Sequence, residues 1–190
     1  MPEKPRITGR RIVARSRLFK VEEMDLQFSN GAQRRFERIA GGTAPASVLV
    51  VPMLDQDTVL LVREYAAAMD RYELGLPKGL MEPGEDPLDA ANREIMEEVG
   101  HGADRLRQLT ELTLAPAYIE HRTLVILAQD LYPRRLPGDE PEPLEVVPWR
   151  LSELEDLLQR PDCTEARTIA ALYLTRTLLS GEHRLSSTPV

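Results

Sequence analysis

Residues 79–101 read GLMEPGEDPLDAANREIMEEVGH, and this stretch decides what kind of protein the chain forms. Its second half predicts a helix from Pro87 to Val99. Asp86 is a suitable N-cap, Pro87 fits the first helical position, and Gly100 supplies the C-terminal stop. The helix carries one apolar stripe that can pack on a sheet. The residues of this stripe are Leu88, Ala91, Ile95 and Val99.

Three acidic residues of this helix lie on one side of it. At about 100° per residue, Glu94, Glu97 and Glu98 fall within an arc roughly 100° wide. Like charges at this spacing destabilise a helix by a few tenths of a kcal/mol each. Mg²⁺ removes that repulsion, because hard divalent cations prefer carboxylate and phosphate oxygens. The alternative to a metal site is an acidic helix face exposed to solvent, and the charge pattern alone favours this alternative.

Upstream of the helix, the loop at residues 82–85 carries another carboxylate. Glu85 is expected to return from this loop and pair with Arg93, in a structural role.

The whole stretch resembles the Nudix box, Gly-x5-Glu-x7-Arg-Glu-U-x-Glu-Glu-x-Gly-U, in which U is a bulky apolar residue. At residue frequencies of about 5–7%, seven fixed identities in register arise by chance roughly once in 10⁸ starts. The resemblance therefore favours a metal site over a solvent-exposed acidic face. The one departure is His101 at the last apolar position, which is the packing end of the motif. The matching residues are Gly79, Glu85, Arg93, Glu94, Ile95, Glu97, Glu98 and Gly100.

The resemblance implies a metal-dependent hydrolase of α+β class. Its fold would be an α/β/α sandwich, with a mixed central sheet between helices. Glu94, Glu97 and Glu98 would bind Mg²⁺, with Mn²⁺ as the other candidate, and the backbone carbonyl of Lys78 would join them. A metal that bridges a pyrophosphate neutralises its charge and turns bound water into a nucleophile. The remaining box residues would be structural: Gly79, Glu85, Arg93 and Gly100.

The rest of the chain indicates two parts, an N-terminal β lobe over 1–42 and the Nudix domain over 43–190. Strands within 11–39 surround a turn at residues 29–31. Residues 41–45 indicate a linker. Two apolar runs, Val48–Leu54 and Val59–Val62, predict a central hairpin. Further strands are expected near 106–113, 122–130 and 144–149, and helices over Leu151–Leu158 and Thr164–Leu179.

Composition narrows the setting of this enzyme. A chain of 190 residues with 42% apolar and 29% charged residues suits a folded domain. Its single cysteine, Cys163, favours a reducing compartment. No signal-like segment opens the chain, and its longest apolar run is too short to span a bilayer. A soluble cytoplasmic protein is expected. The net charge of −7 argues against nucleic acid as partner. The resemblance implies a small-molecule nucleotide as the substrate.

Beyond the box, the chain resembles those Nudix members that hydrolyse ADP-linked compounds. Their substrates, ADP-ribose, NADH and diadenosine polyphosphates, yield AMP or a related mononucleotide. Pro116 and Tyr118 stand where ADP-ribose hydrolases and diadenosine polyphosphate hydrolases carry proline and tyrosine, respectively. Tyr118 is therefore a candidate for substrate binding, and a half-buried loop residue is the alternative. The matching segments include Val62-Arg-Glu-Tyr65, Tyr72-Glu-Leu-Gly75 and Gly138-Asp-Glu-Pro-Glu-Pro143.

Two arginines are candidates for nucleotide binding. Many ADP-ribose hydrolases carry arginine directly after the aromatic of the first segment, but here Tyr65 is followed by Ala66. Either Arg63 or another basic residue would replace that phosphate contact. Arg38 matches an arginine that holds the nucleotide, often across a dimer interface. Arginine suits both tasks because its planar fork binds phosphate and stacks on adenine. A solvated strand position is the alternative for either residue.

The general base is expected in the acidic loop at residues 138–143. Glu140 and Glu142 both fit the loop in which ADP-ribose hydrolases carry a catalytic or metal-binding glutamate, and plain acidic surface is the alternative. We also expect a homodimer, because a small β lobe is marginal alone. Two other functions remain: a Nudix enzyme for another nucleotide sugar or dinucleotide, and a non-catalytic nucleotide sensor. The latter usually lacks box glutamates, which are all present here.

Overall fold

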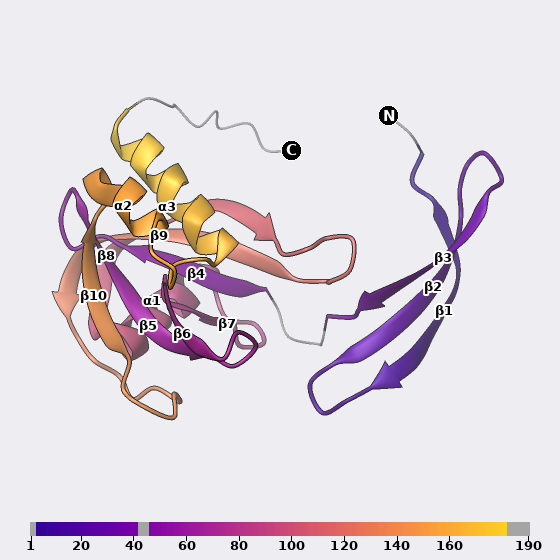
Figure 1. The fold of residues 1–190 in the computed structure, drawn as a ribbon, viewed down its shortest axis with the longest axis horizontal. Coiled ribbons are helices and arrows are strands. Elements are labelled where there is room, and N and C mark those ends of the chain that lie inside the picture. The colour runs from indigo at the N-terminus through magenta and orange to yellow at the C-terminus, as the bar shows by residue number, and fades with distance from the viewer. Residues whose placement is uncertain (1–2, 42–45, 182–190) are drawn as a thin grey trace. The chain divides into compact units, whose positions relative to one another are not determined.

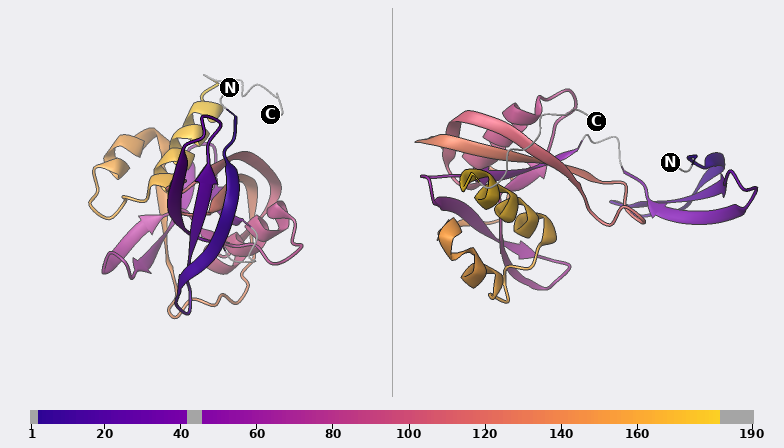
Figure 2. Two further views of the ribbon diagram at one scale, coloured as in Figure 1. Left: turned by 90° about the vertical axis from the view of Figure 1, so that its right-hand side faces the viewer. Right: turned by 90° about the horizontal axis from the view of Figure 1, so that it is seen from above.

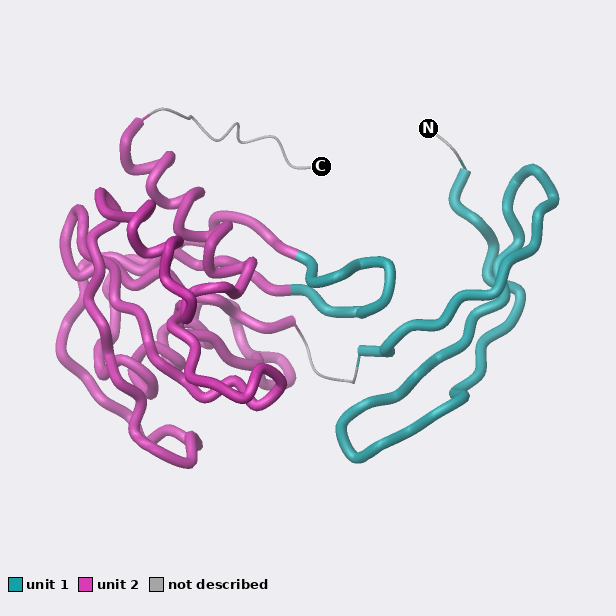
Figure 3. The backbone as a smooth tube through the Cα atoms, viewed as in Figure 1, with its two compact units in different colours: residues 1–45, 113–122 teal, residues 46–112, 123–190 magenta. Residues whose placement is uncertain are grey.

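The computed structural model describes residues 3–41 and 46–181, and the chain forms two compact units (Figures 1 and 3). Unit 1 contains residues 1–45 together with Thr113–Arg122, and unit 2 contains Ala46–Leu112 and Thr123–Val190. Most of the predicted linker, residues 42–45, lies outside the described residues.

Unit 1 contains a three-stranded antiparallel sheet in the order β1 (Arg6–Arg15), β2 (Lys20–Gln27) and β3 (Gln33–Ile39). The turn expected at residues 29–31 is present: Gly31 has a φ of 83°, and the amide of Phe28 donates to the carbonyl of Ala32. The first strand starts at Arg6 and not at residue 11. It is longer because β2 extends far enough for Gln27 to pair with Arg6.

The loop between the eighth and ninth strands belongs to unit 1. Ile39 forms a parallel bridge with Ile119. The amide of Ile39 donates to the carbonyl of Tyr118 at 2.7 Å, and the amide of Glu120 donates to the carbonyl of Ile39 at 3.0 Å. These bonds attach residues 113–122 to the end of β3.

Unit 2 contains two sheets. One has four strands in the order β7-β4-β9-β8, and the other has the order β10-β5-β6. β4 and β9 are parallel, whereas β4–β7, β5–β6 and β5–β10 are antiparallel, so the predicted mixed sheet is confirmed. Neither β6 nor β7 is among the elements expected from the sequence. The strands are β4 (Ser47–Pro52), β5 (Thr58–Ala66), β6 (Arg71–Gly75), β7 (Lys78–Leu80), β8 (His101–Thr113), β9 (Arg122–Pro133) and β10 (Glu145–Arg150).

The predicted central hairpin is wrong. β4 and β5 follow one another, but only an isolated bridge between Met53 and Val59 joins them. β4 pairs with β7 and β9, and β5 pairs with β6 and β10. Both edges of each strand are thus occupied by other partners, so the two strands belong to different sheets.

The helices lie close to the positions predicted from the sequence. α1 spans Pro87–Glu98, with Asp86 accepting a hydrogen bond from the amide of Leu88, and Gly100 has a φ of 72°. A 3-10 turn (Leu151–Glu153) precedes α2 (Leu154–Leu158), so the expected helix over these residues is divided. α3 spans Ala166–Leu179. No helix in the described part of the chain is long and apolar enough to cross a membrane.

Alternate residues of the central strands face two different cores. Val48 and Val50 of β4 belong to a cluster with Ala91 and Ile95 of α1. Leu49 and Val51 of β4 belong to a second cluster with residues of α2 and α3. The right-hand view of Figure 2 shows the strands between α1 on one side and α2 and α3 on the other. The sandwich is confirmed, and burial on both faces explains the continuous apolar runs.

Candidate active site

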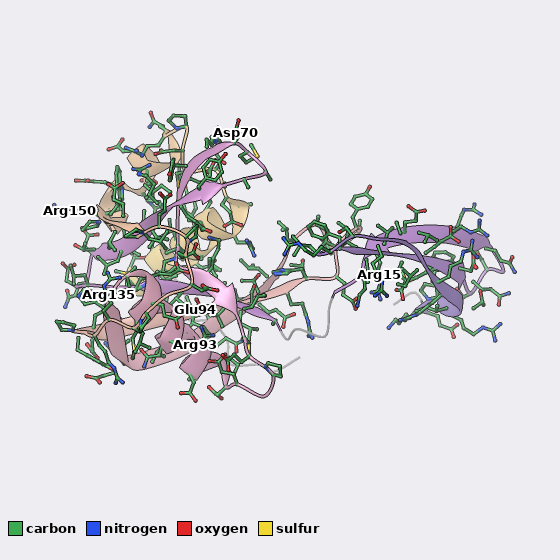
Figure 4. All side chains as sticks on the ribbon, turned by 90° about the horizontal axis from the view of Figure 1, so that it is seen from below. Arg15, Asp70, Arg93, Glu94, Arg135 and Arg150 are labelled. Carbon is green, nitrogen blue, oxygen red and sulfur yellow. The ribbon has the colours of Figure 1, made fainter. Side chains whose placement is uncertain are left out.

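Helix α1 brings the box glutamates to the edge of its buried face. Ile95 is fully buried and Val99 nearly so, which fixes the rotation of the helix against the sheet. Glu94 and Glu98 are each 7% exposed, so these two carboxylates are nearly removed from water. Figure 4 shows Arg93 and Glu94 together on this helix. Packing has therefore placed charged groups where they need compensation.

Gly79 of β7 lies directly against Glu94. A Cβ atom at position 79 would lie 2.0 Å from Oε1 of Glu94. Any side chain here would displace the carboxylate, which gives the physical reason for glycine at the start of the box.

Arg93 organises the carboxylates around it. Its guanidinium donates to both oxygens of Glu85, at 2.9 and 3.1 Å, which is the pair expected from the sequence. It also donates to Glu94 at 2.7 Å and to Glu97 at 3.2 Å. The hydrogen bonds from Arg93 lower the pKa of Glu85. Arg93 thus joins the loop, the helix and two of the three candidate metal ligands.

Glu98 has the most unusual environment of the three glutamates. The amide of Lys78 donates to its Oε1 at 3.4 Å, while no described residue forms a hydrogen bond with its Oε2, which is buried. Burial raises the pKa of Glu98 from 4.5 to about 8. Burial also raises the pKa of Glu94.

The donor set fits a divalent cation, which prefers oxygen ligands and would satisfy the orphaned oxygen of Glu98. In their present rotamers, however, no three acidic, histidine or cysteine side chains of the described residues converge on one point. Glu94 and Glu97 are both turned toward Arg93.

These glutamates line a cleft of about 850 Å³. Its opposite wall is the loop that follows β9, including Arg135, Asp139, Glu140 and Glu142. The cleft is strongly acidic, so a phosphorylated ligand could enter it only with cations that neutralise the repulsion. The whole lining comprises Lys78–Leu80, Glu82, Arg93, Glu94, Glu97, Glu98 and residues 135–144.

The two candidate bases differ within this loop. Burial, followed by the charges of Glu64 and Asp139, raises the pKa of Glu140. Glu142 instead accepts a hydrogen bond from the hydroxyl of Tyr72 at 2.7 Å. Glu140 therefore retains its hydrogen-bonding capacity, whereas Glu142 is partly occupied.

Arg63 lies on β5 and takes part in two ion pairs. Its guanidinium donates to Glu145 at 2.8 Å and to Asp162 at 2.5 Å. Arg160 and Arg63 together lower the pKa of Asp162 to about 2. Arg63 is not among the residues that line the cleft. These contacts make it a link between β5, β10 and the segment before α3.

The other two candidate substrate residues, Arg38 and Tyr118, both lie in unit 1. Arg38 pairs with Glu22 at 2.8 Å and with Glu120 at 3.0 Å. Tyr118 is 69% exposed, and its carbonyl accepts from the amide that follows Arg38. The structure thus brings these two together, while the box glutamates lie in unit 2.

Several residues of the cleft region had no role assigned from the sequence. Glu64 forms an ion pair with the side chain of Lys78, and Arg135 donates to the carbonyl of Glu97 at 3.3 Å. Tyr72 bonds to Glu142. Glu64 and Tyr72 stand in segments that resemble ADP-compound hydrolases, which is the one signal that could have drawn attention to them. Arg135 has no such signal, because its contact depends on the fold.

Comparisons with known proteins agree over nearly the whole chain. Residues 5–38 match the profile of the NudE-type Nudix hydrolase N-terminal domain, and residues 43–173 match the NUDIX domain. The ADP compounds hydrolase NudE of Escherichia coli is 50% identical, covering 96% of this chain and 97% of the relative. The ADP-ribose pyrophosphatase of Bacillus subtilis is 26% identical, with coverage of 84% and 89%. A crystal structure described as an ADP compounds hydrolase superimposes with a TM-score of 0.89 at 49% identity, covering 97% of this chain and 99% of that one.

Proposed function

The chain belongs to the Nudix hydrolase family, and from that premise we propose that it hydrolyses the pyrophosphate linkage of ADP compounds to AMP and a phosphorylated product. ADP-ribose, NADH and diadenosine polyphosphates are the substrates. The observation that carries the proposal is the acidic cleft, which holds a buried carboxylate oxygen without a partner among the described residues. The relatives named for ADP compounds and ADP-ribose support the choice of nucleotide.

Nudix hydrolases generally use divalent cations, and we assign Mg²⁺ to this site, with Mn²⁺ as the other candidate. Glu94, Glu97 and Glu98 would hold it, with the backbone carbonyl of Lys78. When bound, the cation offsets the charge of the pyrophosphate and lowers the pKa of water. Arg93 donates hydrogen bonds to Glu94 and Glu97 and holds their carboxylates near one another. The structural roles of Gly79, Glu85 and Gly100 support this arrangement.

Glu140 is the general base in this proposal. It lines the cleft, and its raised pKa suits proton transfer near neutral pH better than that of an ordinary carboxylate. Glu142 is the second candidate, but its bond to Tyr72 occupies one of its oxygens. Once the base has taken a proton from water, that water attacks phosphorus and the bridging oxygen leaves with the other product.

Arg38 and Tyr118 contact the nucleotide in this proposal. They lie next to one another in unit 1, where an arginine fork and an exposed phenol ring suit phosphate and adenine. Arg63 was the third candidate. It lies in the same unit as the box glutamates but does not line their cleft, which favours a structural role over a phosphate contact.

We assign the chain to a homodimer in which the N-terminal β lobe of each protomer, residues 1–42, reaches across to its partner. Among the described residues of unit 1, only Glu23 is buried, and several large apolar side chains are exposed. The first 45 residues also hold ten basic and five acidic residues, against 14 and 26 in the remainder. A second copy therefore offers both apolar contact and opposite charge. The exposed side chains include Ile7, Ile12, Val13, Phe19 and Phe36.

Product identification tests the proposed function directly. The purified protein in Mg²⁺ should convert ADP-ribose to AMP and ribose 5-phosphate, separated by chromatography. NADH and diadenosine triphosphate should also yield a mononucleotide, while GDP- and UDP-linked sugars should react more slowly. Preferred hydrolysis of a GDP- or UDP-linked sugar would assign another Nudix specificity, and binding without turnover of any compound would indicate a sensor.

The reducing cytoplasm, where we place the enzyme, suits its free, buried Cys163.

A further inference from the structure

We propose that Tyr72 is a positioning residue that fixes the acidic loop through Glu142 and thereby holds Glu140 in the cleft. The inference rests on the proposed function, in which Glu140 takes the proton from water. The hydroxyl of Tyr72 donates to Oε1 of Glu142 at 2.7 Å, which joins the β6 strand to the opposite wall of the cleft.

Tyr72 stands on a rigid part of unit 2. It pairs with Tyr65 in the antiparallel register of β5 and β6, and the two rings make an edge contact with centroids 5.5 Å apart. Leu74 of the same strand is fully buried in the core that includes α2 and α3. The sheet therefore holds the backbone of Tyr72, and the exposed ring of Tyr72 lies against the ring of Tyr65.

The loop has few other attachments. Before it, the amide of Leu136 donates to the carbonyl of Met96 at 3.1 Å. After it, Glu145 pairs with Arg63 at the start of β10. For residues 138–144 the structure records a single hydrogen bond to the rest of the described chain, the one from Tyr72 to Glu142. Removing this bond leaves the middle of the loop without a recorded hydrogen bond to the rest of the described chain.

Two prolines transmit the constraint from Glu142 to Glu140. Pro141 separates the two glutamates and Pro143 follows the second. Each proline fixes its own φ near −65° and restricts the residue before it to extended conformations. The segment 140–143 is therefore stiff, so a bond that anchors Glu142 also limits where the Glu140 carboxylate can lie.

The acceptor of this solvent-exposed bond is a carboxylate. Hydrogen bonds to a carboxylate are shorter and stronger than neutral ones. The same bond raises the pKa of Tyr72, so its hydroxyl stays protonated and remains a donor at neutral pH. Glu142 thus acts as the acceptor that holds the loop, while Glu140 faces the cleft.

Tyr72→Phe tests the role, because it removes the hydroxyl and keeps the ring against Tyr65. Tyr65→Phe is the matched control: its hydroxyl donates to Asp70, which does not line the cleft. With ADP-ribose in Mg²⁺, Tyr72→Phe should lower kcat about 10- to 100-fold and leave KM within about threefold, since a displaced base impairs only the chemical step. Tyr65→Phe should match the wild type, and both variants should unfold at the wild-type midpoint.

A double-mutant cycle with Glu142→Ala separates anchoring from catalysis. If both residues act through one bond, the double variant should lose no more kcat than either single variant. A Glu142→Ala loss far larger than that of Tyr72→Phe would make Glu142 the base and overturn the proposal. So would a wild-type kcat for Tyr72→Phe, or equal losses for the two phenylalanine variants.

Backbone ¹⁵N relaxation gives a second readout that needs no turnover. In the full-length protein, the order parameters of Gly138, Asp139, Glu140 and Glu142 should fall to below about 0.6 in Tyr72→Phe and keep their wild-type values in Tyr65→Phe. Unchanged order parameters in Tyr72→Phe would overturn the anchor even if the enzyme hydrolyses ADP-ribose. Lower order parameters in a protein that does not hydrolyse ADP-ribose would retain the anchor and reject the proposed function.

Discussion

The two units of the chain are stabilised in different ways. Unit 2 has two apolar clusters, one on each face of its central strands. Among the described residues of unit 1, the only buried residue is Glu23. Side chains on neighbouring strands of this unit form exposed ion pairs such as Arg35–Asp25. Exposed ion pairs contribute about 0–1 kcal/mol each, far less than apolar burial. The core of unit 2 can thus hold charged side chains in place. Unit 1 has no such core, and the proposed partner protomer would cover its exposed apolar side chains.

Deleting residues 1–42 is the strongest test of this difference. The Nudix box and both clusters survive the deletion, yet the protein should be inactive and poorly soluble, because the proposed dimer contact and the proposed nucleotide contact of Arg38 would be lost. Turnover of ADP-ribose and sedimentation velocity measure both effects. A wild-type protein that sediments as a stable 21.4 kDa monomer with full activity would contradict the role assigned to unit 1.

Glu98→Gln should remove most activity while the fold of unit 2 remains. The change removes the charge of a proposed metal ligand with little change in volume, so kcat should fall about 10³-fold, or roughly 4 kcal/mol. Kinetics at saturating Mg²⁺ and the unfolding midpoint report the two quantities. Glu37→Gln, an exposed position in unit 1, is the control and should match the wild type. Near wild-type turnover in Glu98→Gln would refute the metal assignment.

Glu140→Gln and Glu142→Gln should differ from one another. Loss of the base lowers kcat about 10²- to 10⁴-fold with little change in KM, and we expect this for Glu140. Glu142→Gln should lose less, since the amide oxygen can still accept from Tyr72. Steady-state kinetics with ADP-ribose decide between them. If neither variant is affected, the base lies elsewhere and the loop is only acidic surface.

Apolar truncations compare the stability of the two units. Leu61 is fully buried, so Leu61→Ala should lower the free energy of unfolding by about 2–5 kcal/mol. Ile12 is 45% exposed in unit 1, and Ile12→Ala should lower it by less than about 1 kcal/mol. Urea unfolding of both variants measures this. Equal losses would mean that unit 1 has a core of its own.

The smallest expected effect concerns ion pairs. The pKa of Asp162 falls from 3.8 to about 2 in the folded protein, held by Arg160 and Arg63, so the carboxylate stabilises the fold above pH 4. Asp162→Asn should therefore cost about 1–2 kcal/mol at pH 7, and the difference should vanish as the pH falls toward 2. Asp25→Asn in unit 1, at a more exposed pair, should cost only a few tenths of a kcal/mol. Urea unfolding at pH 7 and near pH 2 tests both, and a constant difference for Asp162→Asn would exclude this cause.

Local signals in the chain predicted much of the fold and the helix that carries the box glutamates. The cap at Asp86 and the stop at Gly100 act over a few residues, so helix α1 and its row of glutamates could be placed from the sequence. The hairpin of Val48–Leu54 with Val59–Val62 was wrong, because an apolar run does not say which strand it pairs with. β6 and β7 were missed because they are short and polar.

The sequence by itself determined the family, the α+β sandwich and the three helix glutamates, since each depends on spacing along the chain. Tertiary structure alone decided which groups meet these glutamates. It placed Gly79 against Glu94, anchored Glu142 to Tyr72, and joined Arg63 to Asp162, 99 residues away. It also placed Arg38 beside Tyr118 in a unit without a core. The physical reason is that such contacts arise when strands and loops distant in sequence pack together, and no local periodicity encodes them.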